Sequence, residues 1–172
     1  GGSAGAGAGS LGITGAITLY GGSSFTVDDS VGLPVANRLS SRPFTFAGGS
    51  FNYVGNATLN STENLGALTF NRGGVNIITI TAGASAWTNL QSVGSAGLTL
   101  TSFPVLLVRG TNLGSAPGPN VASFSSPTNG FTFIGSGAAG TTNKGILPWA
   151  LVDSSITGTG SSFATADTTT GY

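Results

Sequence analysis

The sequences ITLYGGSSFTV at residues 17–27 and FTFAGGSFNYV at residues 44–54 decide the fold of this chain. Each joins two short runs of alternating apolar residues through a Gly-Gly pair, and a looser version, LTFNRGGVNIITI, follows at residues 68–80. Alternation with a period of two is typical of β-strands, and Gly-Gly is typical of tight turns. The sequence therefore predicts an all-β protein.

The spacing of this unit favours a particular β architecture. Comparable strands begin near residues 17, 44, 68 and 98. That period suits one coil of a parallel β-helix, in which stacked coils bury a continuous core. We expect residues 1–172 to form a single β-solenoid segment of about six coils. The interior is predicted to hold the alternating pairs Ile17 and Leu19, Phe25 and Val27, Phe44 and Phe46, Phe51 and Tyr53, Leu68 and Phe70, Ile78 and Ile80, Leu98 and Leu100, and Phe131 and Phe133.

An antiparallel arrangement is the alternative. Gly-Gly between two alternating runs is also a signal for a β-hairpin, so the same sequences are compatible with a hairpin array or an antiparallel β-sandwich. The two folds differ in which strands pair: neighbours in the sequence pair in a hairpin, whereas strands one coil apart pair in a solenoid.

The composition argues against several classes of function. The 172 residues include five basic and five acidic ones, so the net charge is zero. A nucleic-acid-binding protein needs clustered Lys and Arg, and the five cations here are scattered. The most apolar run, FPVLLV at residues 103–108, is far shorter than the roughly 18 residues of a membrane helix, so no membrane span is expected in this segment.

Catalytic equipment is sparse in the sequence. The chain has no Cys and no His, which removes thiolate nucleophiles, the usual general base and the commonest metal ligands. Among the five acidic residues only Asp28 and Asp29 are adjacent, and glycoside hydrolysis normally uses two carboxyl groups across the bond. We therefore expect no enzyme activity, no cofactor and no metal centre.

Asp28 and Asp29 have two interpretations. Their oxygens could contribute to a Ca²⁺ site, which needs six to eight ligands. The alternative is that they cap a turn or pair with Arg38 or Arg42, and the absence of regular Asp-Gly nonapeptides favours this second interpretation.

Arginine and aromatic side chains are the candidate contact residues. Arg109, Trp87 and Trp149 are the possible contacts to a partner or glycan. The alternative for arginines, including Arg38, is a structural one, since a guanidinium at a coil corner can donate to several backbone carbonyls. Core packing is the alternative for the two tryptophans and for the tyrosines Tyr20 and Tyr53.

Asparagine and threonine recur along the predicted strands and turns. Stacked residues of this kind can form hydrogen-bonded ladders along the axis of a solenoid, which would give a rigid shaft. They are equally typical of turns that tolerate unusual backbone angles. The residues concerned include Asn56, Asn60, Asn64, Asn71 and Asn76.

The order of these segments resembles the autotransporter-associated β-strand repeat proteins, the passenger-like surface proteins of bacteria. The resemblance is carried, in order, by ITLYGGSSFTVDDS, ANRL at residues 36–39, FTFAGGSFNYVGN, ENLGALTFNRGGVNIITITAG at 63–83, LLVRGTNLG at 106–114, ILPWA at 146–150 and SSFATAD at 161–167. It implies a right-handed parallel β-helix and a location outside the cell or on its surface. It implies no shared active site.

These observations lead to one expected function and one alternative. We expect a non-catalytic structural protein that builds a rigid stalk, filament or layer by end-to-end stacking, because open coil ends expose unpaired strand edges. Its principal partner would be another copy of itself, and the chain looks like part of a longer chain or assembly. The alternative is an adhesin or glycan-binding surface module.

Overall fold

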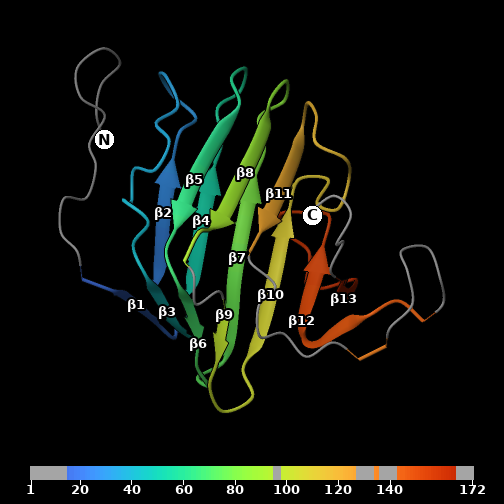
Figure 1. Cartoon of the computed structure of the whole chain (residues 1–172). Coiled ribbons are helices and arrows are strands. Elements are labelled where there is room, and N and C mark those ends of the chain that lie inside the picture. Colours follow the sequence, from blue (N-terminus) through green and yellow to red (C-terminus); the bar gives the residue numbers. More distant parts are fainter. Residues whose placement is uncertain (1–14, 95–97, 127–133, 136–142, 166–172) are drawn as a thin grey trace.

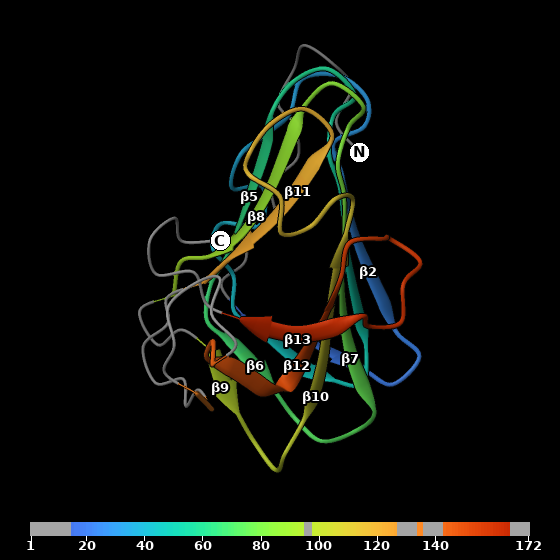
Figure 2. The same cartoon turned by 90° about the vertical axis from the view of Figure 1, so that its right-hand side faces the viewer.

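The computed structural model describes residues 15–94, 98–126, 134–135 and 143–165. Its strands wind as a β-solenoid, in which the chain passes through three sheets in turn and then returns to the first (Figure 1). The sheets form the sides of the coil, as Figure 2 shows from the end of the molecule. The all-β prediction is confirmed, and the fold is a solenoid.

We name the three sheets A, B and C in the order in which the chain enters them. Sheet A contains β1 (Ile17–Tyr20), β3 (Phe44–Ala47), β6 (Leu68–Phe70) and β9 (Leu98–Leu100). Sheet B contains β2 (Ser24–Asp28), β4 (Ser50–Val54), β7 (Val75–Thr81), β10 (Val105–Gly110), β12 (Ile146–Asp153) and β13 (Ser162–Thr165). Sheet C contains β5 (Ser61–Leu65), β8 (Trp87–Ser92) and β11 (Val121–Ser125).

The four strands that the sequence places one period apart lie side by side in sheet A. Ile17 pairs with Phe44, Phe44 with Leu68, and Leu68 with Leu98, all in parallel register. The predicted recurrence is therefore the stacking period of the coil.

The number of coils is smaller than expected. The structure has about three turns where the sequence suggested six. Two features account for the difference. The third side of the first coil is an irregular segment, residues 30–43, so sheet C has only three strands. After β11 the chain adds β12 to sheet B and then reverses, because β13 pairs antiparallel with β12.

The Gly-Gly pairs are corners between sheets A and B. β1 pairs with β3, and β2 pairs with β4, so the strands on either side of Gly21-Gly22 belong to different sheets. At the next corner Gly48 has a φ of +91°, and a Cβ added there would lie 2.2 Å from the Gly73 carbonyl oxygen of the coil that follows. Only glycine fits this position, because neighbouring corners stack in backbone contact. The hairpin and sandwich alternative is wrong.

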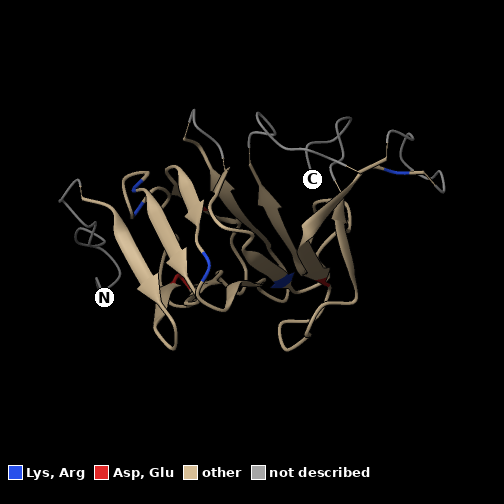
Figure 3. Cartoon of the chain, turned by 90° about the horizontal axis from the view of Figure 1, so that it is seen from below, with Lys and Arg blue, Asp and Glu red and all other residues tan. Residues whose placement is uncertain are grey.

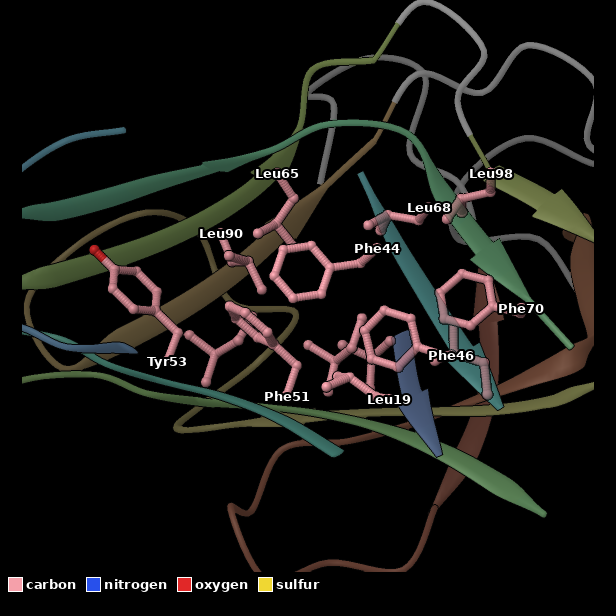
Figure 4. Close-up of a cluster of buried hydrophobic side chains, with 14 of the residues drawn as sticks. Leu19, Phe44, Phe46, Phe51, Tyr53, Leu65, Leu68, Phe70, Leu90 and Leu98 are labelled. Atoms are coloured by element: carbon pink, nitrogen blue, oxygen red, sulfur yellow. The ribbon is translucent and has the colours of Figure 1, made fainter. Parts of the chain in front are cut away.

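Side chains that alternate along the strands fill the interior of the coil. Leu19, Phe46 and Phe70 come from successive strands of sheet A, and each is buried. Aromatic rings stack along the axis, with ring centroids 5.0 Å apart for Phe46 and Phe70. Figure 4 shows that these rings and the leucines of sheets A and C point toward one another.

The predicted interior positions are largely confirmed. Leu100 is 37% exposed, because no strand follows β9 in sheet A within the described residues. Tyr53 is buried as predicted, whereas Tyr20 is 67% exposed, so a core position for Tyr20 was wrong. Phe131 and Phe133 lie outside the described residues.

Polar side chains add hydrogen bonds between coils. The Asn76 side chain accepts the Gly48 N–H at 2.7 Å and donates to the Val105 carbonyl at 3.1 Å, so it links three successive coils. Asn64 accepts a hydrogen bond from Gln91 one coil away. Asn56 also caps a local turn, since its Oδ1 accepts the Leu59 N–H at 3.1 Å. Some asparagines therefore link neighbouring coils, and others stabilise turns.

Charged residues are few and scattered along the described chain, as Figure 3 shows, and Asp29, Arg42 and Glu63 are buried. The described part of the chain contains no helix long and apolar enough to cross a membrane.

Candidate functional site

A buried polar cluster lies beside the irregular segment 30–43. It consists of Asp29, Arg38, Tyr53 and Glu63. Asp29 follows the end of β2, Tyr53 lies on β4, and Glu63 lies on β5. Parallel stacking brings these three positions to the same end of the coil, and segment 30–43 contributes Arg38.

The cluster is joined by direct hydrogen bonds. The Arg38 guanidinium forms an ion pair with the Asp29 carboxylate, and the Tyr53 hydroxyl donates to Asp29 Oδ2 at 3.1 Å. Arg38 Nη1 also donates to the Asp28 carbonyl at 3.1 Å. The buried Asp29 charge is therefore paired and hydrogen-bonded, as a buried carboxylate must be.

The Glu63 carboxylate accepts hydrogen bonds from the backbone of segment 30–43. It accepts the N–H groups of Arg38 at 2.9 Å, Leu39 at 3.0 Å and Asn64 at 3.2 Å. These bonds stand where a regular strand of the first coil would have paired with β5. Glu63 thus satisfies backbone donors that the irregular segment would otherwise leave buried and unpaired.

Two pKa values in this cluster are shifted by burial. Burial raises the pKa of Tyr53 above its ordinary value, and the neighbouring Asp29 charge raises it further. Burial also raises the pKa of Glu63; the N–H groups of Leu39, Arg38 and Asn64 lower it in part, and Asp29 raises it again. Tyr53 therefore stays protonated and remains a donor to Asp29.

The cluster is suited to holding the fold together. Asp29 and Glu63 are both 0% exposed, so a substrate in solvent has no access to either carboxylate. Each is engaged by donors from two parts of the chain. The arrangement fixes segment 30–43 against the second coil.

Asp28 and Asp29 adopt the structural roles that the sequence offered. Asp28 Oδ1 accepts the Ser30 N–H at 2.8 Å, which is a turn cap, and the Ser30 hydrogen bonds lower the pKa of Asp28. Asp29 pairs with Arg38. Among the described residues, no three His, Cys, Asp or Glu side chains are grouped to hold a metal ion.

Arg109 lies on β10 and is partly buried on the outer face of sheet B. Its Nε donates to Thr79 Oγ1 at 3.0 Å, and its Nη1 donates to the Gly158 carbonyl at 3.1 Å. Asp153, its neighbour in register on β12, accepts the N–H groups of Ser155 and Gly160 in the same loop. Arg109 thus donates to one side-chain hydroxyl and one backbone carbonyl of the chain, from a strand and not from a corner.

The other two candidate contact residues lie elsewhere. Trp87 is half-buried on β8, where its Nε1 donates to Ser123 Oγ at 2.9 Å. Trp149 lies on β12 and packs against the hydrophobic core. The structure therefore does not bring Arg109, Trp87 and Trp149 into one site, and their role as partner or glycan contacts stays a prediction.

The sequence did not predict that Glu63 and Tyr53 belong to one cluster. Glu63 shares the inward phase of β5 with Ser61 and Leu65, which are both buried. This alternation in the sequence could have indicated that Glu63 is buried and hydrogen-bonded, because a carboxylate that points into the interior needs partners. Tyr53 was assigned to the core correctly, but its hydrogen bond to Asp29 depends on stacking that the sequence does not show.

The fold places this chain in the class of β-solenoid proteins. Comparison with protein-family models, with curated proteins and with solved structures finds no match.

Proposed function

We propose that this chain is a non-catalytic structural protein, a rigid β-solenoid unit of a stalk, filament or layer. The observation that carries the proposal is the parallel register of successive coils from β1 to β9, from β2 to β12 and from β5 to β11. Each coil is hydrogen-bonded to the next along the axis, so bending the rod would break backbone hydrogen bonds.

The interior and the surface support the same role. The core is a continuous column of apolar side chains, and burying each large one contributes about 1.5–3 kcal/mol. Side chains such as Asn76 add polar links between coils. The low charge of the chain suits a surface that makes few non-specific electrostatic contacts.

The two ends of the coil differ, which gives assembly a direction. At the first coil, β1 and β2 are edge strands that pair on one side only within the described residues. At the other end of sheet B, β13 runs antiparallel and interrupts the parallel stack. We infer that end-to-end association places the β1 and β2 edge of one copy against the opposite end of the next copy, where β9 and β11 are edge strands within the described residues, since unpaired strand edges readily accept another strand.

The proposal also covers the handedness of the coil and the location of the protein. The resemblance to autotransporter-associated repeat proteins supports a right-handed coil and a place on the bacterial surface or outside the cell. Right-handed winding is also the general rule for parallel strands joined by crossovers.

Electron microscopy of the purified chain, with light scattering across a concentration series, tests the structural role. We expect rods or larger assemblies whose size grows with concentration. Thr26→Lys places a charge on the edge strand β2 and should reduce association. Thr81→Lys, on the interior strand β7, is the matched control and should leave it unchanged. A discrete monomer at high concentration would contradict the proposal.

A further inference from the structure

Four threonines form a row on the outer face of sheet A. Thr18 pairs with Thr45, Thr45 with Thr69, and Thr69 with Thr99. Each strand of the sheet contributes one, and the strand spacing of about 4.8 Å sets the distance between neighbours. We call Thr18, Thr45, Thr69 and Thr99 the threonine row.

The row lies on the solvent side of sheet A, where Thr18 and Thr99 are exposed and Thr45 and Thr69 are half-buried. The residues on either side of Thr45 and Thr69 in their strands are fully buried in the core. None of the four hydroxyl groups has a hydrogen-bond partner within the described residues, whereas the Thr79 hydroxyl on sheet B accepts from Arg109. The hydroxyls of the row are therefore available to an external partner.

The other two faces lack such a row. On sheet B the corresponding positions are Thr26, Asn52, Thr79, Arg109 and Asp153, which differ in size and charge. On sheet C, Thr62 is followed by Asn89 and Ser123. Sheet A alone repeats one side chain on all its strands, and β1, β3, β6 and β9 contain no charged residue.

Threonine combines two groups that act on water in different ways. Its hydroxyl donates and accepts hydrogen bonds, and its methyl group restricts the orientations of adjacent water molecules. Repeated at a fixed interval without charge, these groups hold water at regularly spaced positions. We propose that the threonine row is an ice-binding surface, whose partner is the ordered water lattice of ice.

A polysaccharide fits the row less well. Proteins commonly grip sugar rings with aromatic platforms and with amide, carboxylate or guanidinium groups, and the row contains none of these. Beside the row on the same face, Ala47 and Ala67 are small, and Tyr20, which is in register with Ala47 and 67% exposed, is an aromatic side chain at the first-coil end. Crystalline cellulose and chitin are therefore included in the test as competing partners.

Ice-affinity partitioning tests this proposal. The fluorescently labelled chain is mixed with slowly growing polycrystalline ice, and its concentration is measured in the ice and in the remaining liquid; thermal hysteresis is recorded on the same samples. We expect enrichment in the ice fraction and a measurable hysteresis gap. Thr45→Lys and Thr69→Lys should abolish both, since a charged, longer side chain interrupts the row.

The matched control is Thr62→Lys, which makes the same change at a half-buried strand threonine of sheet C. It should leave ice enrichment unchanged, and circular dichroism must show that all variants are folded. Exclusion of the unaltered chain from ice overturns the proposal, as does equal loss in Thr62→Lys. Binding to cellulose or chitin without ice enrichment also overturns it. The structural role is tested separately by microscopy.

Discussion

At the residue scale, the stability of the first coil depends on a few buried polar side chains. Glu63 and Asp29 carry charge into an otherwise apolar interior, and each is matched by donors. Burying such groups is costly unless every partner is present. Changes that remove one partner should therefore cost more than changes at the surface.

Tyr53→Phe removes the hydroxyl that donates to Asp29 and leaves the ring in place. We expect the free energy of unfolding to fall by about 1–3 kcal/mol, because a buried carboxylate loses one donor. Urea denaturation measures the change. Tyr20→Phe, at an exposed tyrosine, is the control and should alter stability by less than about 0.5 kcal/mol. Equal effects of the two variants would contradict the role of Tyr53.

Glu63→Gln tests the pH dependence that burial imposes. The pKa of Glu63 is raised in the folded chain, so the stability that it contributes is fully present below its ordinary value of 4.5. That contribution is lost as the pH rises through the folded-state pKa. We expect the wild type to lose stability relative to Glu63→Gln as the pH rises above 4.5, measured by urea denaturation. A difference that stays constant with pH would show that Glu63 does not titrate in this way.

At the element scale, the corners between sheets A and B determine how tightly the coils stack. The first three corners use Gly-Gly, but the fourth, between β9 and β10, has Ser102 and Phe103 in the left-handed region with φ of 60° and 53°. The early corners are therefore relaxed and the last one is strained.

Gly48→Ala should be severely destabilising. Gly48 and Gly22 both have positive φ, 91° and 79°, but only Gly48 has a carbonyl oxygen in the path of an added Cβ. Gly22→Ala should cost about 1–2 kcal/mol from the backbone conformation alone. Gly48→Ala should cost about 3 kcal/mol or more, since the opposing group is backbone. Thermal unfolding compares the two, and similar costs would argue against stacked corners.

Phe103→Gly should stabilise the chain. Phe103 is 99% exposed, so its side chain contributes no packing, while its left-handed backbone costs about 1–2 kcal/mol. Glycine removes that strain at a cost of about 0.5–1 kcal/mol in chain entropy, which leaves a net gain of up to about 1 kcal/mol. Phe103→Ala retains a Cβ and should show no gain. Equal melting temperatures for the Gly and Ala variants would refute the assignment of strain.

At the scale of the whole molecule, the sequence reveals the stacking period but not the length of the stack. The period is visible in the sequence because strands of similar pattern begin at Ile17, Phe44, Leu68 and Leu98. The pattern recurs because every coil must place apolar side chains at the same inward-facing positions. The number of coils was overestimated because β13 reverses direction, and no local pattern in SSFAT indicates with which strand it pairs.

The buried cluster and the threonine row illustrate the same limit. Asp29 and Tyr53 are 24 residues apart in the sequence, and Arg38 and Glu63 are 25 apart, so their proximity follows from the register of stacked coils. The four threonines of the threonine row occur in the sequences ITLY, FTFA, LTF and LTL. That they lie side by side becomes evident only when the strands are known to stack in parallel.

Disulfide trapping tests the central claim, that strands one coil apart pair and strands across a Gly-Gly corner do not. The chain has no Cys, so two introduced cysteines have no native thiol with which to form a competing disulfide. In the solenoid Thr18 is the direct neighbour of Thr45, whereas a hairpin at Gly21-Gly22 would place Thr18 opposite Phe25. We predict that the Thr18→Cys, Thr45→Cys variant forms an intramolecular disulfide under mild oxidation and that the Thr18→Cys, Phe25→Cys variant does not. The reverse result would contradict the solenoid.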